Sequence, residues 1–152
     1  MGHYDFNKDL AKAQCIEERV IVHLKKEHSD MDFHGFSHQK GYDCHFSMGG
    51  VYYKLEIKSD YHTNHTGNIV IEYESRGYES GITTTQANLL AYAVITPKGL
   101  DIYLFTVKRI RDLIADEAYH AKLVGGDIGS NTRMYVFKLD EIEQYAKKTK
   151  EY

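Results

Sequence analysis

Two strand-like segments joined by a short glycine-containing turn constrain the fold more than any other feature of the sequence. They are Tyr42–Phe46 and Val51–Lys58, and Ser47-Met48-Gly49-Gly50 lies between them. This pattern predicts a β-hairpin, because glycine adopts the positive φ angles that tight turns require. Apolar and polar side chains alternate along the second segment, in the order Tyr53-Lys54-Leu55-Glu56-Ile57-Lys58. One face of that strand is therefore predicted to join the core, and the other to be polar.

Helical and strand patterns flank this hairpin on both sides. From about Phe6 to Lys26 the apolar residues recur at spacings of three, four and seven, which predicts an amphipathic helix. Further strands are expected at residues 68–74, 92–96, 100–106 and 134–139, helices at 83–91, 107–118 and 140–150, and polar loops at 27–41 and 124–133. This order predicts an α/β fold of the α+β mixed-sheet kind, in which helices flank a central mixed β-sheet and residues 1–152 form one domain.

The composition excludes several classes of protein. The chain has 152 residues, of which 42% are hydrophobic and 27% charged, which suits one domain with a core and a charged surface. No segment approaches the ~20 apolar residues of a membrane helix, and we expect no membrane partner. The N-terminal residues lack the pattern of a secretory signal, and two cysteines do not make a disulfide framework. We therefore expect a reduced chain in the cytoplasm.

The formal net charge of −3 argues against a protein that coats nucleic acid through bulk positive potential. It does not argue against a nuclease. An enzyme of that class needs an acidic metal-binding centre, and the divalent ions bring their own positive charge to the phosphate.

Asp43, Glu56 and Lys58 carry the strongest chemical signal. Glu56 and Lys58 share the polar face of their strand, and hairpin pairing places Asp43 opposite Lys54 or Glu56. Carboxylate oxygens are the ligands that Mg²⁺ prefers, and a neighbouring lysine can orient a water molecule and offset charge on a phosphate. Taken alone, Glu-x-Lys also fits an ordinary solvated pair on a strand.

Glu17 lies where a solvated glutamate is not expected. At about 100° per residue it falls within the apolar stripe of the first helix, whereas Glu18 points away. A carboxylate on a core-facing stripe must be paired, protonated or bound to a metal. A structural salt bridge is one interpretation, and a metal ligand or a group oriented by Lys58 is the other.

Together these residues resemble the PD-(D/E)XK nuclease superfamily. The likeness rests on a helix with an inward glutamate, then Gly41-Tyr42-Asp43, a hairpin and Leu55-Glu56-Ile57-Lys58, and it covers roughly residues 6–92. The following stretch, residues 67–77 and 80–82, looks like small phage-type members, and the superfamily also includes Holliday junction resolvases. Tyr42 stands where the motif has proline.

The resemblance implies a restriction-endonuclease-like core and a metal-dependent DNA endonuclease. It implies that Asp43 and Glu56 bind Mg²⁺ or Mn²⁺, that the Ile57 carbonyl adds a ligand, and that Lys58 acts on the water and the phosphate. It further implies that Glu17 assists from the first helix, that the enzyme works as a homodimer, and that it is a phage protein acting in a host cytoplasm.

Three further residues are weaker candidates for contacts with DNA. Arg76 matches phosphate geometry and Lys54 can line the rim of the site, although each also fits an ordinary surface residue. Some relatives carry a glutamine on the helix after the third strand, where this chain has Gln86, which also fits a plain helix surface. His62 and His65 suggest a metal pair, but no further ligand completes a zinc set, so a solvated loop is the simpler interpretation.

Two alternatives to a nuclease stay open at this level. A protein of the same fold could have lost catalysis and act as a DNA- or protein-binding module. A zinc protein built on the histidines is the other. The kind of DNA that would be cut, whether branched, duplex or single-stranded, is not indicated by the sequence, and RNA is equally compatible.

Overall fold

The computed structural model describes the backbone of residues 6–39 and 41–151, and the side chains of residues 15–39 and 41–151. In chain order the elements are α1 (Phe6–Glu27), β1 (Met31–Phe36), β2 (Cys44–Met48), β3 (Val51–Asp60), α2 (Thr63–Thr66), β4 (Asn68–Ser75), β5 (Tyr78–Glu79), the 3₁₀ helix η1 (Gly81–Thr83), β6 (Leu89–Thr96), β7 (Gly99–Thr106), α3 (Val107–Ala115), β8 (Ala121–Gly125), β9 (Thr132–Lys138), α4 (Leu139–Ile142), the 3₁₀ helix η2 (Glu143–Tyr145) and β10 (Lys147–Glu151).

The strands form two sheets. The larger has six strands in the order β1-β2-β3-β6-β7-β10, and the smaller has four in the order β5-β4-β9-β8. In the larger sheet β3 and β6 run parallel and the other neighbours run antiparallel, so the sheet is mixed. The predicted fold class, a mixed sheet flanked by helices, is confirmed. No helix among the described residues is long and apolar enough to cross a membrane.

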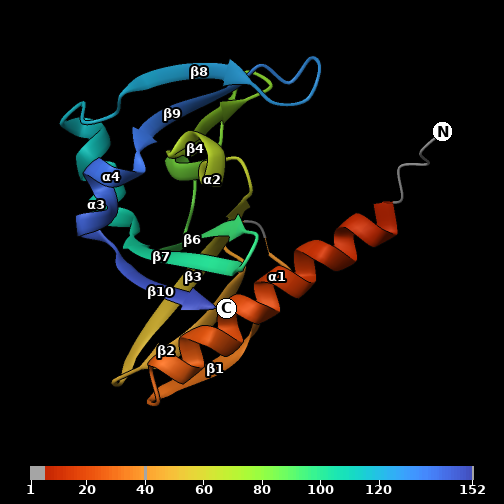
Figure 1. Cartoon of the computed structure of the whole chain (residues 1–152), viewed down its shortest axis with the longest axis vertical. Coiled ribbons are helices and arrows are strands. Elements are labelled where there is room, and N and C mark those ends of the chain that lie inside the picture. Colours follow the sequence, from red (N-terminus) through yellow and green to blue (C-terminus); the bar gives the residue numbers. More distant parts are fainter. Residues whose placement is uncertain (1–5, 40, 152) are drawn as a thin grey trace.

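A separate apolar cluster packs on each face of the larger sheet. On one face α1 crosses the strands, and its first turns project beyond the sheet (Figure 1). Its buried side chains Val20, Ile21 and Leu24 belong to the same cluster as Leu55 and Ile57 of β3. Within the described side chains of α1, this contact explains why the positions of Val20, Ile21 and Leu24 are apolar.

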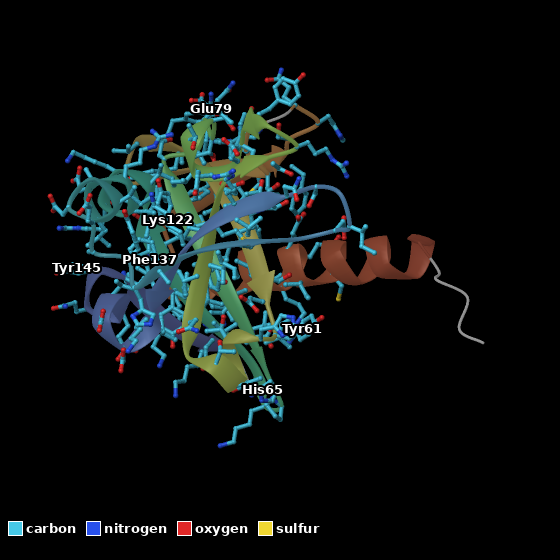
Figure 2. The ribbon with its side chains drawn as sticks, turned by 90° about the horizontal axis from the view of Figure 1, so that it is seen from above. Tyr61, His65, Glu79, Lys122, Phe137 and Tyr145 are labelled. Atoms are coloured by element: carbon cyan, nitrogen blue, oxygen red, sulfur yellow. The ribbon has the colours of Figure 1, made fainter. Side chains whose placement is uncertain are left out.

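The second cluster joins the other face of the larger sheet to the smaller sheet and α3. Leu90 of β6 and Phe105 of β7 pack there with Ile69 of β4, Phe137 of β9 and Ile110 of α3. Figure 2 shows Phe137 within the body of the molecule, and it labels His65 and Glu79, which lie near opposite ends of β4. This second layer covers β6 and β7, and the same face of β1, β2 and β3 carries polar side chains instead.

Several predicted elements are wrong, and the helix at residues 83–91 is the most consequential. The structure has η1 there, followed by β6, whose residues Leu89 to Val94 are all buried. A strand in the middle of a sheet is covered on both faces, so its apolar run has no period that separates it from a buried helix. The predicted strand at 92–96 is the second part of β6.

The two edge strands of the larger sheet, β1 and β10, also differ from the prediction. Residues 27–41 were predicted to be a loop, but β1 forms there and pairs with β2. Residues 140–150 were predicted to be one helix, but helical turns end at Tyr145 and β10 then pairs with β7. Each of these strands forms because it pairs with the free edge of a neighbouring strand, β1 with β2 and β10 with β7. This is a tertiary effect rather than a local one.

The smaller sheet was not predicted. Its strand β4 falls where a strand was expected, but it pairs with β9 rather than beside the hairpin. Residues 121–125 form β8, although no strand was predicted there and the predicted loop at 124–133 overlaps its end. Helix α3 matches its prediction apart from an earlier end, and the Thr106 hydroxyl caps it by accepting a hydrogen bond from the Arg109 N–H.

Candidate functional site

Asp43 lies at the end of the hairpin, directly before the pair that Cys44 of β2 forms with Leu55 of β3. Its N–H donates to the Leu55 carbonyl at 2.9 Å, so the Asp43 backbone contacts β3 at Leu55, next to Glu56. Of the two predicted positions, Lys54 pairs with His45 instead, whereas the charge of Asp43 acts on Glu56.

The Asp43 carboxylate is held in place by the backbone of β3. Its Oδ2 atom accepts a hydrogen bond from the Ile57 N–H at 2.6 Å. A charge-assisted bond of this length fixes the side chain, and it leaves the second carboxylate oxygen available to another partner. Asp43 as a whole is half-buried.

Glu56 is a half-buried carboxyl group with other carboxylates nearby. Burial raises the pKa of Glu56, the charge of Lys58 lowers it, and the charges of Asp43 and Glu72 raise it again. A hydrogen bond from Thr85 also lowers this pKa. The ionised form of Glu56 is therefore disfavoured overall, which is the condition of a carboxylate that lacks a sufficient positive partner.

Glu17 approaches Asp43 from α1. Burial raises the pKa of Glu17, and the negative charge of Asp43 raises it further. The same two carboxylates, together with burial, raise the pKa of the buried Cys44 thiol to about 12. The Asp43 charge thus acts on both Glu17 and Glu56, which makes Asp43 the common neighbour of the other two acidic residues that the sequence singled out.

Lys58 follows Glu56 on the polar face of β3. Its side chain is exposed, and its charge acts on Glu56. Glu56 and Lys58 line a small pocket with Val70 and Glu72 of β4 and with Leu90 of β6. The pocket lies where the polar face of β3 meets the smaller sheet, so the carboxylate and the ammonium share one recess.

The donor set suits a hard divalent cation. Oxygen ligands, all of them carboxylates, are what Mg²⁺ and Mn²⁺ prefer, and a cation would relieve the repulsion that raises the pKa values of Glu17 and Glu56. Within the described side chains, no three His, Cys, Asp or Glu residues are already arranged as a metal-binding group. The carboxylates are therefore electrostatic neighbours whose side chains would have to close around an ion.

Two residues of the site were missed from the sequence. Thr85 is buried, and its single hydroxyl hydrogen has two acceptors within reach, the Gly41 carbonyl at 2.9 Å and the Glu56 carboxylate. Glu72 lies on β4, in the smaller sheet. Neither sits in a local pattern that marks it: Thr85 lies in a run of threonines, and Glu72 in an ordinary strand alternation.

Gln86 lies next to the acidic residues but not on a helix. Its N–H donates to the Gly41 carbonyl at 2.9 Å. A Cβ atom added to Gly41 would lie 3.1 Å from the Gln86 Cγ atom, so the Gln86 side chain packs directly against the segment that precedes Asp43. The predicted helix is wrong, yet the residue does reach the neighbourhood of the site.

The two predicted basic contacts differ in their surroundings. Lys54 shares the polar face of β3, and its Nζ atom lies 4.9 Å from the centre of the Tyr42 ring. Arg76 is exposed in the turn between β4 and β5, where it has a positive φ of 56° and donates its N–H to the Ser130 carbonyl. Lys54 therefore belongs to the same surface as Glu56, whereas Arg76 lies in the smaller sheet.

The segment that contains His62 and His65 is held by hydrogen bonds to Asp60. Asp60 Oδ1 accepts the His62 N–H at 2.7 Å, and the one-turn helix α2 follows. Asp60 also accepts, at 2.5 Å, the hydroxyl hydrogen of Tyr92, which in turn accepts the Val70 N–H. This network joins the larger sheet to the smaller one.

No family model, no curated protein and no solved structure matches the chain. The case for a function therefore rests on the residues and their geometry.

Proposed function

We propose that this protein is a divalent-metal-dependent endonuclease that hydrolyses phosphodiester bonds in DNA. The observation that carries the proposal is the proximity of Asp43 to both Glu56 and Glu17 at the end of the β2–β3 hairpin, with Lys58 beside Glu56 on β3. The resemblance of the same four residues to the PD-(D/E)XK superfamily supports it, as does the all-oxygen donor set.

Each residue has a role that its position suits. Asp43 and Glu56 would hold Mg²⁺ or Mn²⁺, with the Ile57 carbonyl and Glu17 as further ligands. The bound ion would polarise the phosphate and acidify a water molecule. The Asp43 carboxylate enters the site already oriented, because the Ile57 N–H fixes one of its oxygens.

Lys58 supplies the positive charge of the site. Its ammonium group stands on the same strand face as Glu56, where it can hydrogen-bond the attacking water and offset negative charge that develops on the phosphate. A neutral side chain at this position would leave that charge uncompensated. A homodimer acting in the cytoplasm, with one subunit for each strand, belongs to the same proposal.

The test is a DNA cleavage assay in Mg²⁺ on a panel of duplex, single-stranded, nicked and four-way-junction substrates. The wild-type protein is expected to cut at least one of them. Asp43→Asn keeps an oxygen that can accept the Ile57 N–H but removes the charge, and Lys58→Ala removes the ammonium. Each is expected to reduce the cleavage rate by about a hundredfold or more.

The matched controls are Asp127→Asn and Lys98→Ala, both at exposed positions in turns. They are expected to leave cleavage unchanged. Full activity in Asp43→Asn, measured on protein whose thermal unfolding is unaltered, would contradict the assignment of the site.

A binding module without catalysis is the second candidate, and one observation favours it. One oxygen of Asp43 is already occupied by the Ile57 N–H, and no described group of three ligands stands ready for a metal. Such a protein would bind DNA equally well with and without Mg²⁺ and would leave every substrate of the panel intact.

A further inference from the structure

A row of aromatic and histidine rings extends the polar face of β3 away from the acidic residues. We name it the ring face and define it by His34 of β1, His45 of β2, Tyr52 and Lys54 of β3, and Tyr42, which precedes Asp43. His45 pairs with Lys54, and Lys54, Glu56 and Lys58 alternate with the core-facing residues of β3. The ring face therefore shares one side of the sheet with Glu56 and Lys58, whereas Glu17 approaches from α1 on the other side.

The rings of the ring face contact one another as a cluster. The ring centres of His34 and His45 lie 5.8 Å apart, those of His45 and Tyr52 lie 5.7 Å apart, and those of Tyr52 and His34 lie 6.1 Å apart. The Tyr42 ring meets the His45 ring edge-on at 6.2 Å. These separations exceed the rise of about 3.4 Å between stacked bases of one duplex strand. Rings spaced in this way suit bases that are already unstacked.

Hydrogen bonds hold these rings in position. The Tyr52 hydroxyl and His45 Nδ1 are 3.0 Å apart, and His34 Nε2 lies 2.7 Å from the Ser47 hydroxyl. Lys54 stands over the Tyr42 ring, so a positive charge accompanies the first ring of the row. The hydrogen bonds fix His34, His45 and Tyr52, and Tyr42 is held by the core cluster on which it packs.

The ring face is open within the described residues. The Tyr52 residue is 49% exposed, and the His34 side chain is 34% exposed. The smaller sheet and α3 cover β6 and β7, and α1 lies on the opposite face. Asp32 lies 4.0 Å from His34 Nδ1, which adds a negative charge at the end of the ring face that is far from Lys54.

We propose that the ring face binds single-stranded DNA, with successive bases stacked on its rings and the backbone led past Lys54 to Lys58 and the acidic residues. The proposal deepens the proposed function and rests on it, because it names the substrate as DNA with an unpaired segment next to the bond that is cut. A duplex keeps its bases stacked inside the helix and offers only their edges, whereas every unpaired base offers a flat face to a ring.

Binding of a fluorescein-labelled single strand, followed by fluorescence anisotropy in EDTA, tests this inference without any cleavage. Tyr52→Ala and Tyr42→Leu are expected to weaken single-strand binding by about tenfold each, which is the loss of one stacked base. Tyr52→Phe keeps the ring and is expected to bind like the wild type. Tyr78→Ala, at a tyrosine that is 78% exposed on β5, is the matched control and is also expected to bind like the wild type.

Two comparisons make the outcome decisive. A blunt duplex of the same sequence is expected to bind more weakly than the single strand and to be insensitive to Tyr52→Ala. Unchanged single-strand affinity in both Tyr52→Ala and Tyr42→Leu would overturn the proposal, and so would a preference for RNA of the same sequence over DNA.

The same experiment separates failure of the ring face from failure of the proposed nuclease. Cleavage by the wild-type protein together with unaltered binding by Tyr52→Ala would overturn the ring face alone. Tyr52-dependent binding of single strands by a protein that cuts nothing in Mg²⁺ would keep the ring face and overturn the nuclease.

Discussion

The two faces of β3 lie on the same ten-residue strand and serve opposite purposes. Toward α1 the strand presents Leu55 and Ile57, which are 0% and 7% exposed and belong to an apolar cluster. Toward the other side it presents Glu56 and Lys58, whose charges act on each other and on neighbouring carboxylates. The comparison teaches that the α1 face supplies stability, which allows the polar face to keep an arrangement that costs stability.

The acidic residues around β3 are unfavourable by themselves for a simple electrostatic reason. Burial removes part of the water that would screen Glu56 on the polar face and Glu17 on α1, and the charge of Asp43 acts on both. Protonation relieves this repulsion, and so does a cation. A face of this kind is expected where a protein binds an ion or a charged substrate rather than where it needs to fold tightly.

The largest effect that would sharpen this comparison is expected on the α1 face. Leu55→Ala removes a fully buried side chain from the cluster and should lower the free energy of unfolding by about 2–5 kcal/mol. Urea unfolding followed by circular dichroism measures it. Lys54→Ala, at the adjacent position on the polar face, should cost about 1 kcal/mol or less, mainly the contact with Tyr42. Equal losses in the two variants would break the distinction between the faces.

A smaller effect of opposite sign is expected on the polar face. The pKa of Glu56 is raised by burial above its ordinary value of 4.5, so the folded protein holds the proton more tightly than the unfolded chain. Ionisation of Glu56 therefore costs stability above its folded-state pKa, and the cost vanishes below about pH 4. Glu56→Gln should stabilise the metal-free protein at pH 7 and be neutral in acid.

Unfolding free energies at several pH values, measured in EDTA, check the sign of this effect. Glu18→Gln is the matched control, because Glu18 is exposed on α1 and should show no pH-dependent gain. A loss of stability in Glu56→Gln at pH 7 would mean that the ionised carboxylate is well compensated by Lys58 and Thr85, contrary to the electrostatic picture.

Local patterns were sufficient to predict the parts of the site that lie on one hairpin and its neighbouring helix. The alternation of β3 and the length of the turn are local, and they predict that Asp43 lies near Glu56 at the end of the hairpin. The spacing that turns Glu17 toward the core face of α1 is also a local pattern. In the structure Glu17 approaches Asp43 from that helix. Thr85 and Glu72 lie near Glu56 only because of tertiary structure. Thr85 belongs to the segment before β6, and Glu72 belongs to β4 of the smaller sheet. No spacing in the sequence indicates either residue.

The same distinction explains where the predicted fold was wrong. The α1 stripe and the hairpin have clear periods of their own, whereas β6 is apolar on both faces and has none. The charged sequence of Lys147–Glu151 predicts the end of a helix, yet this segment forms β10 because β7 has an unpaired edge. At the end of β10 the Arg19 guanidinium donates two hydrogen bonds to Glu151. Such pairing depends on which edge is free, which is decided only after the rest of the sheet has formed.

The most direct measurement of the central claim is a calorimetric titration of the full chain with Mn²⁺ at pH 7. The account predicts that the wild-type protein binds the ion, that Asp43→Asn and Glu56→Gln each weaken the binding by at least about tenfold, and that Asp127→Asn does not. It also predicts tighter binding as the pH rises, because Glu17 and Glu56, whose pKa values are raised, must lose their protons to become ligands. Absence of Mn²⁺ binding by the wild-type protein, or full binding by Asp43→Asn and Glu56→Gln, would contradict it.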